Sequence, residues 1–193
     1  MSWKKWYPIL LKEQEEYQKT APKVSPSHQT DHILRVWEVA KKMCIRLGGD
    51  LEVMVAAVLL HDLGRHHGLV VHGKKSAEVA KPILEHHKFP KEKIPKVLEA
   101  ISQHDCDFPR EERKLLESKI LNDADRADVF GVIGIYRHIL FINAGRMKIE
   151  EVIPVSKKRW NSIMLPESKK LLKDDYDYFI DFFKTLQNKL RKN

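Results

Sequence analysis

The residues most able to do chemistry are a histidine and an aspartate that stand side by side after an apolar run. Residues 51–60 are apolar except for Glu52, and His61 and Asp62 follow directly. A run this apolar over about three turns predicts a helix that is buried on all sides, so both polar side chains are expected at the edge of a core. Because buried polar groups need partners, and imidazole nitrogen with carboxylate oxygen suits a divalent cation, the pair is a candidate metal site.

Helices are predicted to position this pair. Asp50 is expected to cap the start of the central helix, and Gly64 to end it as a C-terminal glycine does. Trp3 to Thr20 has apolar residues at helical spacing and predicts a packing helix. A further helix is expected from Thr30 or Asp31 to Leu47, with His32 in its first turn on the side of its apolar stripe.

Residues 65–76 form a segment rich in glycine and cations, after the His-Asp pair. One interpretation is a solvated surface loop. The other is a phosphate-binding lip, because the segment offers mobile backbone, positive charge and hydrogen-bond donors. Ser76 is expected to cap a helix over 77–87, where the helix dipole would favour an anion.

Two further histidines stand between this segment and a group of aspartates. His72 lies in the predicted loop, and His104 follows a helix predicted from Pro90 to about Gln103. Asp123 and Asp125 come later in the chain. For His72 and His104, a metal ligand, a phosphate contact and a plain surface histidine remain open.

The order of these residues resembles the HD-domain superfamily of metal-dependent phosphohydrolases, whose pattern is a histidine, then His-Asp, then a distant aspartate. The resemblance runs from about His28 to Arg137. It implies an all-α fold of the HD type and the metal ligands His32, His61, Asp62 and Asp125. Asp125 is preferred to Asp123 because it stands in the stretch Ala-Asp-Arg-Ala, which follows the family pattern.

The resemblance also implies the chemistry. Two imidazoles and two carboxylates leave positions for water on a manganese, magnesium, iron or nickel ion, and metal-bound water would attack the phosphorus of a nucleotide or a related small phosphoester or phosphoanhydride. Asp62 is the general-base candidate. The candidates to neutralise substrate phosphate are Arg65, Lys75 and Arg126. His72 and His104 are candidates for a second metal or a phosphate contact, although a single metal is favoured because neither lies on a buried periodic stripe.

Two alternatives belong to other functional classes. The extra histidines would suit a dinuclear HD-fold oxygenase or phosphodiesterase. The net charge of +8 would suit a non-catalytic nucleotide- or RNA-binding HD module. However, the cations are interleaved with acids along the whole chain, so nucleic acid is an unlikely partner.

Length and composition set the remaining expectations. The 193 residues suit a single domain over 1–193, with a motif core at about 28–137 and closing helices over 148–193. Neither a membrane-spanning run nor a signal peptide is indicated, and Cys44 and Cys106 lack the spacing of a thiolate metal site. These features predict a cytoplasmic protein with reduced thiols; the oligomeric state is left open.

Overall fold

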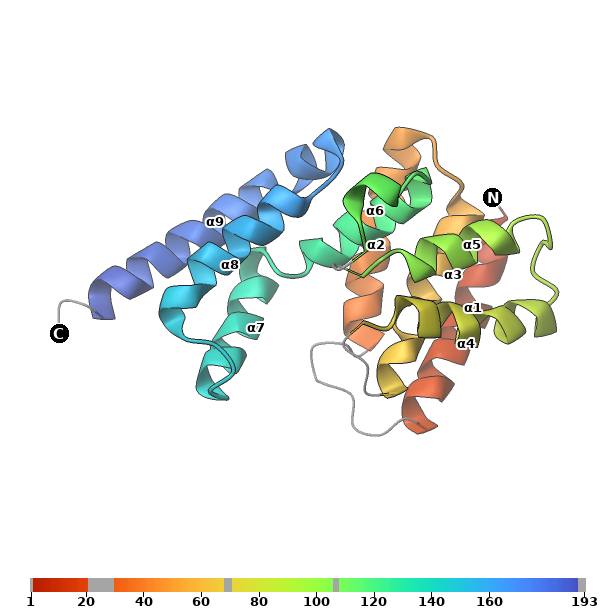
Figure 1. Ribbon diagram of the computed structural model, residues 1–193, viewed down its shortest axis with the longest axis horizontal. Coiled ribbons are helices and arrows are strands. Elements are labelled where there is room, and N and C mark those ends of the chain that lie inside the picture. Colours follow the sequence, from red (N-terminus) through yellow and green to blue (C-terminus); the bar gives the residue numbers. More distant parts are fainter. Residues whose placement is uncertain (1, 21–29, 68–70, 106–107, 191–193) are drawn as a thin grey trace. The chain divides into compact units, whose positions relative to one another are not determined.

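The helix that precedes the His-Asp pair lies at the centre of its part of the structure. Helix α3 spans Leu51–Leu60, and the side chains of Val53 to Leu60 have no exposed surface. Its most extensive contacts are with three other helices (Figure 1): α1 (Trp3–Thr20), α2 (Thr30–Leu47) and α5 (Ile94–Ser102). The side chain of Asp50 accepts the N–H groups of Glu52 and Val53. The predicted burial and the predicted N-cap are confirmed.

This computed structural model describes residues 2–20, 30–67, 71–105 and 108–190, and every regular element in these ranges is a helix. The predicted all-α class is therefore confirmed. The predicted connector over 21–28, Gly68 of the predicted phosphate loop, and Cys106 lie outside the described residues. Cys44 is a buried free cysteine.

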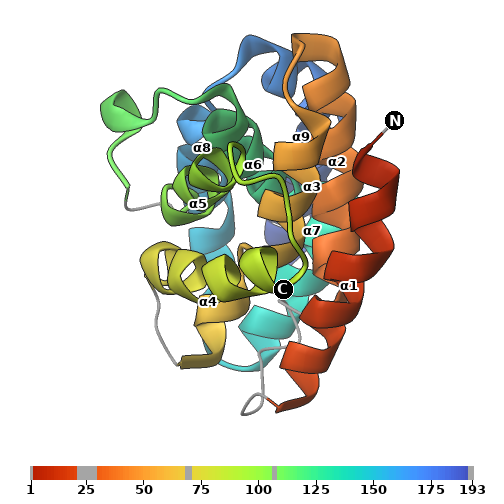
Figure 2. The ribbon, with the colours of Figure 1, turned by 90° about the vertical axis from the view of Figure 1, so that its right-hand side faces the viewer.

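The chain folds into two compact units, Met1–Ala124 and Asp125–Asn193. The predicted single domain stays a prediction. The first unit contains α1, α2, α3, α4 (Gly73–His86) and α5, together with most of α6 (Leu116–Ala127). Within it, α1 runs along one side of α3, and α4 packs on α5 (Figure 2). The short 3₁₀ helices Leu63–His67 and Arg110–Glu112 complete its described elements.

The prediction that Gly64 ends the central helix is wrong. Helix α3 ends at Leu60 with His61 as its C-cap, and Gly64 lies inside the 3₁₀ helix Leu63–His67. Glycine is needed here for a close approach instead. A Cβ atom on Gly64 would lie 2.6 Å from the backbone oxygen of His72 and 2.6 Å from the backbone nitrogen of Ser76.

The predicted cap at Ser76 is also wrong. Helix α4 begins at Gly73, so Ser76 lies within its first turn. The buried Ser76 hydroxyl accepts the backbone N–H of Gly64 at 2.9 Å. This bond fastens the start of α4 to the segment that follows the His-Asp pair.

The second unit consists of α7 (Gly131–Asn143), α8 (Ile149–Ser162) and α9 (Pro166–Leu190), together with the last residues of α6. Its core contains Val152, Phe179 and Phe183, and a buried ion pair joins Asp128 to Arg137. None of the helices in the described ranges is long and apolar enough to cross a membrane.

Candidate metal centre

Four helix ends bring the candidate ligands together in the first unit. His61 and Asp62 follow the last residue of α3, and His32 lies in the first turn of α2. His72 precedes α4, and His104 follows α5. All five are buried, with exposed fractions between 0% and 6%. The expected inward position of His32 is confirmed, whereas sequence periodicity gave no reason to expect the burial of His72 and His104.

The Asp62 carboxylate lies between these histidines. Its Oδ1 atom is 2.7 Å from Nε2 of His72, 3.5 Å from Nε2 of His61 and 3.8 Å from Nε2 of His104. Its Oδ2 atom is 3.8 Å from Nε2 of His32. Asp62 therefore reaches every histidine of the group.

Two trios of possible ligands result, and they share Asp62. Among the described residues, His32, His61 and Asp62 form one trio, and Asp62, His72 and His104 form the other. Within each trio the ligand atoms lie within 4.8 Å of one another. Imidazole nitrogen with carboxylate oxygen is a suitable donor set for a divalent transition metal ion, so the residues present fit a cation.

Two of the histidine rings are oriented by backbone carbonyl groups. Nδ1 of His61 donates to the carbonyl of Val58 at 2.8 Å, and Nδ1 of His104 donates to the carbonyl of Ile101 at 2.6 Å. Because a carbonyl only accepts, the hydrogen of each neutral ring is on Nδ1. Each ring then presents the lone pair of Nε2 to the cluster, as a metal ligand must.

The rings of His72 and His104 face each other through their Nε2 atoms, 3.0 Å apart. Two lone pairs at this distance repel unless a proton or a cation lies between them. Burial, and then the neighbouring rings of His61 and His72, lower the pKa of His104. Burial alone would lower the pKa of His72, but the hydrogen bond and charge of Asp62 outweigh it and raise that pKa. Burial therefore sets the direction for His104, whereas Asp62 sets it for His72.

The three cations predicted to contact phosphate have different surroundings. Arg65 is at the cluster, where its Nε donates to Oδ1 of Asp62 at 2.9 Å. Arg126 belongs to the second unit and donates to the hydroxyl of Ser162 at 2.9 Å. Lys75 forms an exposed ion pair with Glu78 at 3.0 Å.

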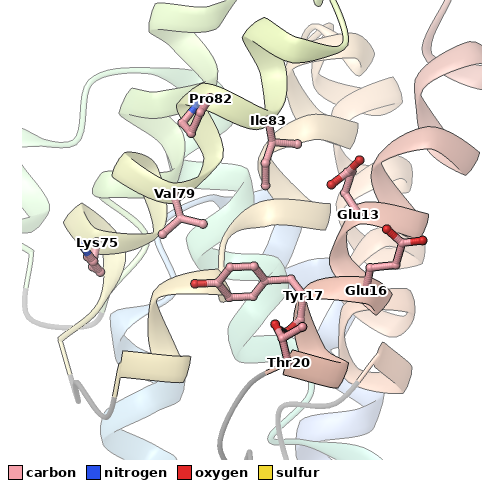
Figure 3. Close-up of a pocket in the computed structure, with 8 residues that line it drawn as sticks. All are labelled: Glu13, Glu16, Tyr17, Thr20, Lys75, Val79, Pro82 and Ile83. Atoms are coloured by element: carbon pink, nitrogen blue, oxygen red, sulfur yellow. Dashed lines mark hydrogen bonds between the residues drawn. The ribbon is translucent and has the colours of Figure 1, made fainter.

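Lys75 also lines an open pocket of about 550 Å³ between α1 and α4. Figure 3 shows Lys75 at one end of this pocket, with Tyr17 projecting from α1 toward α4. The other residues around it are Glu13, Glu16, Thr20, Val79, Pro82 and Ile83. None of the clustered histidines lines this pocket, so it is separate from the metal centre.

The two aspartates that compete for the place of the last ligand differ in burial and belong to different units. Asp123 is fully buried and belongs to the first unit, whereas Asp125 is partly buried and begins the second. Neither belongs to the two trios found among the described residues. The assignment of Asp125 therefore continues to rest on the family pattern.

Sequence reasoning missed two residues that touch the cluster. Asn122 donates its side-chain N–H to the carbonyl of His104 at 3.1 Å and so joins α6 to the cluster. Asp105 lies 3.2 Å from Nδ1 of His72. The available signal for Asp105 was a second His-Asp pair, His104-Asp105, which follows a helix as His61-Asp62 does.

Over the described residues, the all-helical fold with buried His/Asp trios at converging helix ends has the donor set of a metal-binding helical protein. A family model for the HD domain matches residues 30–129, more than half of the chain. The chain therefore belongs to the HD domain family. No protein of curated function matches it by sequence.

Solved structures agree with this fold over nearly the whole chain. A predicted HD-superfamily hydrolase from an uncultured Thermotogales bacterium is 26% identical, with a TM-score of 0.72 over 95% of this chain and 92% of its own. An HD-superfamily hydrolase from Bacillus thuringiensis is 19% identical, with a TM-score of 0.79 over 99% of this chain and 100% of its own. Bacillus subtilis YpgQ, solved in complex with ADP, is 18% identical, with a TM-score of 0.74 over 98% of this chain and 97% of its own. Family and donor set support a metal-dependent hydrolase as the general class.

Proposed function

We propose that this chain is a metal-dependent phosphohydrolase that acts on a nucleotide or a related small phosphoester or phosphoanhydride. The observation that carries the proposal is the pair of buried trios that share Asp62. Buried imidazole and carboxylate groups cost free energy unless they have partners, and a cation would be a partner common to all of them. The HD domain match supports the same reaction class.

His32, His61 and Asp62 would hold the cation, and the family pattern adds Asp125 as the fourth ligand. A divalent cation supplies Lewis-acid chemistry there, since it lowers the pKa of a water molecule and polarises a phosphoryl oxygen. Manganese, magnesium, iron and nickel remain the candidates, because the donor set suits each of them.

The protein's own residues would then position the substrate and move the proton. Asp62, at the centre of the cluster, is the candidate to accept the proton of the attacking water. Arg65 contacts Asp62 and has 29% of its side chain exposed, so it can reach from the cluster toward a phosphate group in solution. Lys75 and Arg126 remain candidate phosphate contacts that depend on where the rest of the substrate lies.

A second candidate is a dinuclear centre of the phosphodiesterase or oxygenase type. The Asp62, His72 and His104 trio favours it, because Asp62 could join two cations. The predicted single cation rested on the lack of any signal that these histidines point inward, and both are buried. Oxygen consumption in the presence of iron separates the oxygenase from either hydrolase.

The experiment is a screen of nucleoside mono-, di- and triphosphates and of a phosphodiester, each with Mn²⁺, Mg²⁺, Fe²⁺ or Ni²⁺. ADP is the first compound to test, because the YpgQ structure holds it. Products are separated by chromatography, and the matched control is Asp62→Asn, which keeps the side-chain shape. We expect hydrolysis by the wild type only, and only with a metal. Equal turnover by Asp62→Asn, or turnover after chelation of all metal, contradicts the proposal.

A further inference from the structure

The carboxylate of Asp105 joins the start of α4 to the ring of His72. Its Oδ2 atom accepts the backbone N–H of His72 at 3.1 Å and that of Gly73 at 2.6 Å. Its Oδ1 atom lies 3.2 Å from Nδ1 of the His72 ring. Asp105 therefore holds both the backbone and the side chain of a residue that stands 33 positions earlier.

The surroundings of Asp105 hold the backbone of this residue in place. Arg113, which is 3% exposed, donates to the backbone oxygen of Asp105 at 3.1 Å and to that of Gln103 at 2.6 Å. A Cβ atom on Gly73 would lie 2.8 Å from Oδ2 of Asp105 and 2.8 Å from the backbone oxygen of Ser102. The start of α4 thus lies directly against the end of α5, with Asp105 between them.

The two carboxylates beside the His72 ring, together with a bound cation, decide which ring nitrogen carries the hydrogen. A carboxylate only accepts hydrogen bonds, and a carboxylate faces each ring nitrogen: Asp105 lies 3.2 Å from Nδ1, and Asp62 lies 2.7 Å from Nε2. A cation bound by Nε2 would take the place of the hydrogen on that nitrogen, which leaves the ring hydrogen on Nδ1 beside Asp105. The Nε2 lone pair would then point into the trio, where Nε2 also lies 3.0 Å from Nε2 of His104. Backbone carbonyls orient the rings of His61 and His104 in the same sense, whereas His72 depends on a side chain.

We propose that Asp105 is a positioning residue of the metal centre. It keeps the hydrogen of the His72 ring on Nδ1, so that Nε2 is aimed as a ligand into the trio of Asp62, His72 and His104. The inference rests on the proposed function, because it requires that a cation binds at this trio. Nothing in the HD pattern of the sequence assigns this role to Asp105.

The decisive variant is Asp105→Asn. The amide oxygen can still accept the two backbone N–H groups, so the start of α4 is kept. The amide nitrogen would face Nδ1 of His72 and donate to it, which moves the ring hydrogen to Nε2 and removes the ligand lone pair. We expect the Mn²⁺ affinity that depends on His72 to fall about tenfold to a hundredfold, as for other lost carboxylate partners of metal-bound histidines.

Isothermal titration calorimetry with Mn²⁺ measures this loss in the full chain without any substrate. The His72→Ala variant shows which bound Mn²⁺ ion depends on His72. Because both substitutions act on the same ligand, the double variant His72→Ala with Asp105→Asn should bind Mn²⁺ no more weakly than His72→Ala alone. Glu78→Gln is the matched control, since it neutralises an exposed carboxylate of α4. It should bind Mn²⁺ as the wild type does.

A second measurement needs no variant. In ¹⁵N-histidine-labelled wild type loaded with diamagnetic Zn²⁺, the chemical shifts of the His72 ring should report hydrogen on Nδ1. Hydrogen on Nε2, or Mn²⁺ binding by Asp105→Asn equal to that of the wild type, overturns the role of Asp105 while the proposed function stands. A wild type that binds none of Mn²⁺, Mg²⁺, Fe²⁺ and Ni²⁺ overturns both.

Discussion

Nε2 of His72 lies 2.7 Å from Oδ1 of Asp62, although neither residue belongs to an α-helix. This contact connects the ligands that the HD pattern assigns with histidines that the pattern does not assign. Because Asp62 belongs to both trios, its loss should disable both, whereas the loss of His72 should disable one.

The first prediction follows from this shared position of Asp62. Asp62→Ala and His61→Ala should each abolish metal-dependent hydrolysis and lose bound metal, while the far-UV circular dichroism keeps its helical signal. Addition of Mn²⁺ should raise the melting temperature of the wild type, because a ligand at a hundredfold excess over its Kd stabilises the native state by about 2.7 kcal/mol. Differential scanning fluorimetry measures the shift. An equal Mn²⁺-induced shift in the Asp62→Ala protein would argue against this site.

The second prediction separates the two aspartates of α6. If Asp125 is the fourth ligand, Asp125→Asn should lower the affinity for Mn²⁺ strongly, and Asp123→Asn only mildly. Each variant serves as the control of the other, because both neutralise one carboxylate of the same helix. Equal losses, or the reverse order, in a Mn²⁺ titration would mean that the family pattern was placed on the wrong aspartate.

The number of bound cations gives the third prediction. Because His72 and His104 are buried beside Asp62, we expect a stoichiometry near two Mn²⁺ per chain, which falls toward one in His72→Ala and in His104→Ala. Elemental analysis of the purified proteins gives the count. If the wild type holds one metal and both variants retain it, with only KM or kcat changed, the single-cation prediction from the sequence holds instead.

The fourth prediction concerns His138 in the second unit. Its Nδ1 donates to the carbonyl of Gly134 at 2.7 Å, and its ring packs on Phe179 with 5.0 Å between the ring centres. Burial, helped by the positive charges of Arg159 and Arg137, lowers the pKa of His138 to about 4. An unfolded histidine has a pKa near 6.5, so between these values the unfolded chain binds a proton that the folded chain does not. Stability from His138 is therefore complete above about pH 6.5 and is lost as the pH falls toward 4.

Urea denaturation with metal chelated tests this linkage. From about pH 7 to about pH 5 the wild type should lose roughly 2 kcal/mol more of its free energy of unfolding than His138→Gln does. The comparison removes the contributions of all other groups that titrate in both proteins. Parallel losses in the two proteins would show that His138 is not held neutral.

The contrast between what the sequence predicted and what it missed has a physical reason. The apolar run 51–60 predicts its own burial, and the position of His32 follows from the apolar stripe of its helix, because both are local periodic signals. The burial of His72 depends on contacts with Ser76, Asp62 and Asp105, of which the last is 33 positions away. Helical periodicity carries no information about such contacts, so it offered no reason to expect a buried histidine in a predicted loop.

The same limit explains the errors at Gly64 and Ser76. Glycine after an apolar run is a common helix end, and serine before one is a common cap, so both predictions used correct local rules. In the structure the two residues bond to each other, 12 positions apart. The start of α4 packs closely against the 3₁₀ helix, and this close approach requires glycine at position 64 and a small side chain with a hydroxyl group at position 76.

The most direct test of the metal centre is a crystal structure of the protein soaked with Mn²⁺, with anomalous scattering used to locate the metal. We predict a peak about 2.0 to 2.2 Å from Asp62 and from Nε2 of both His32 and His61, since divalent ions bind nitrogen and oxygen at such distances. A second peak is expected beside Asp62, His72 and His104. Mn²⁺-dependent hydrolysis by a protein whose only anomalous peaks lie away from Asp62 would contradict the account.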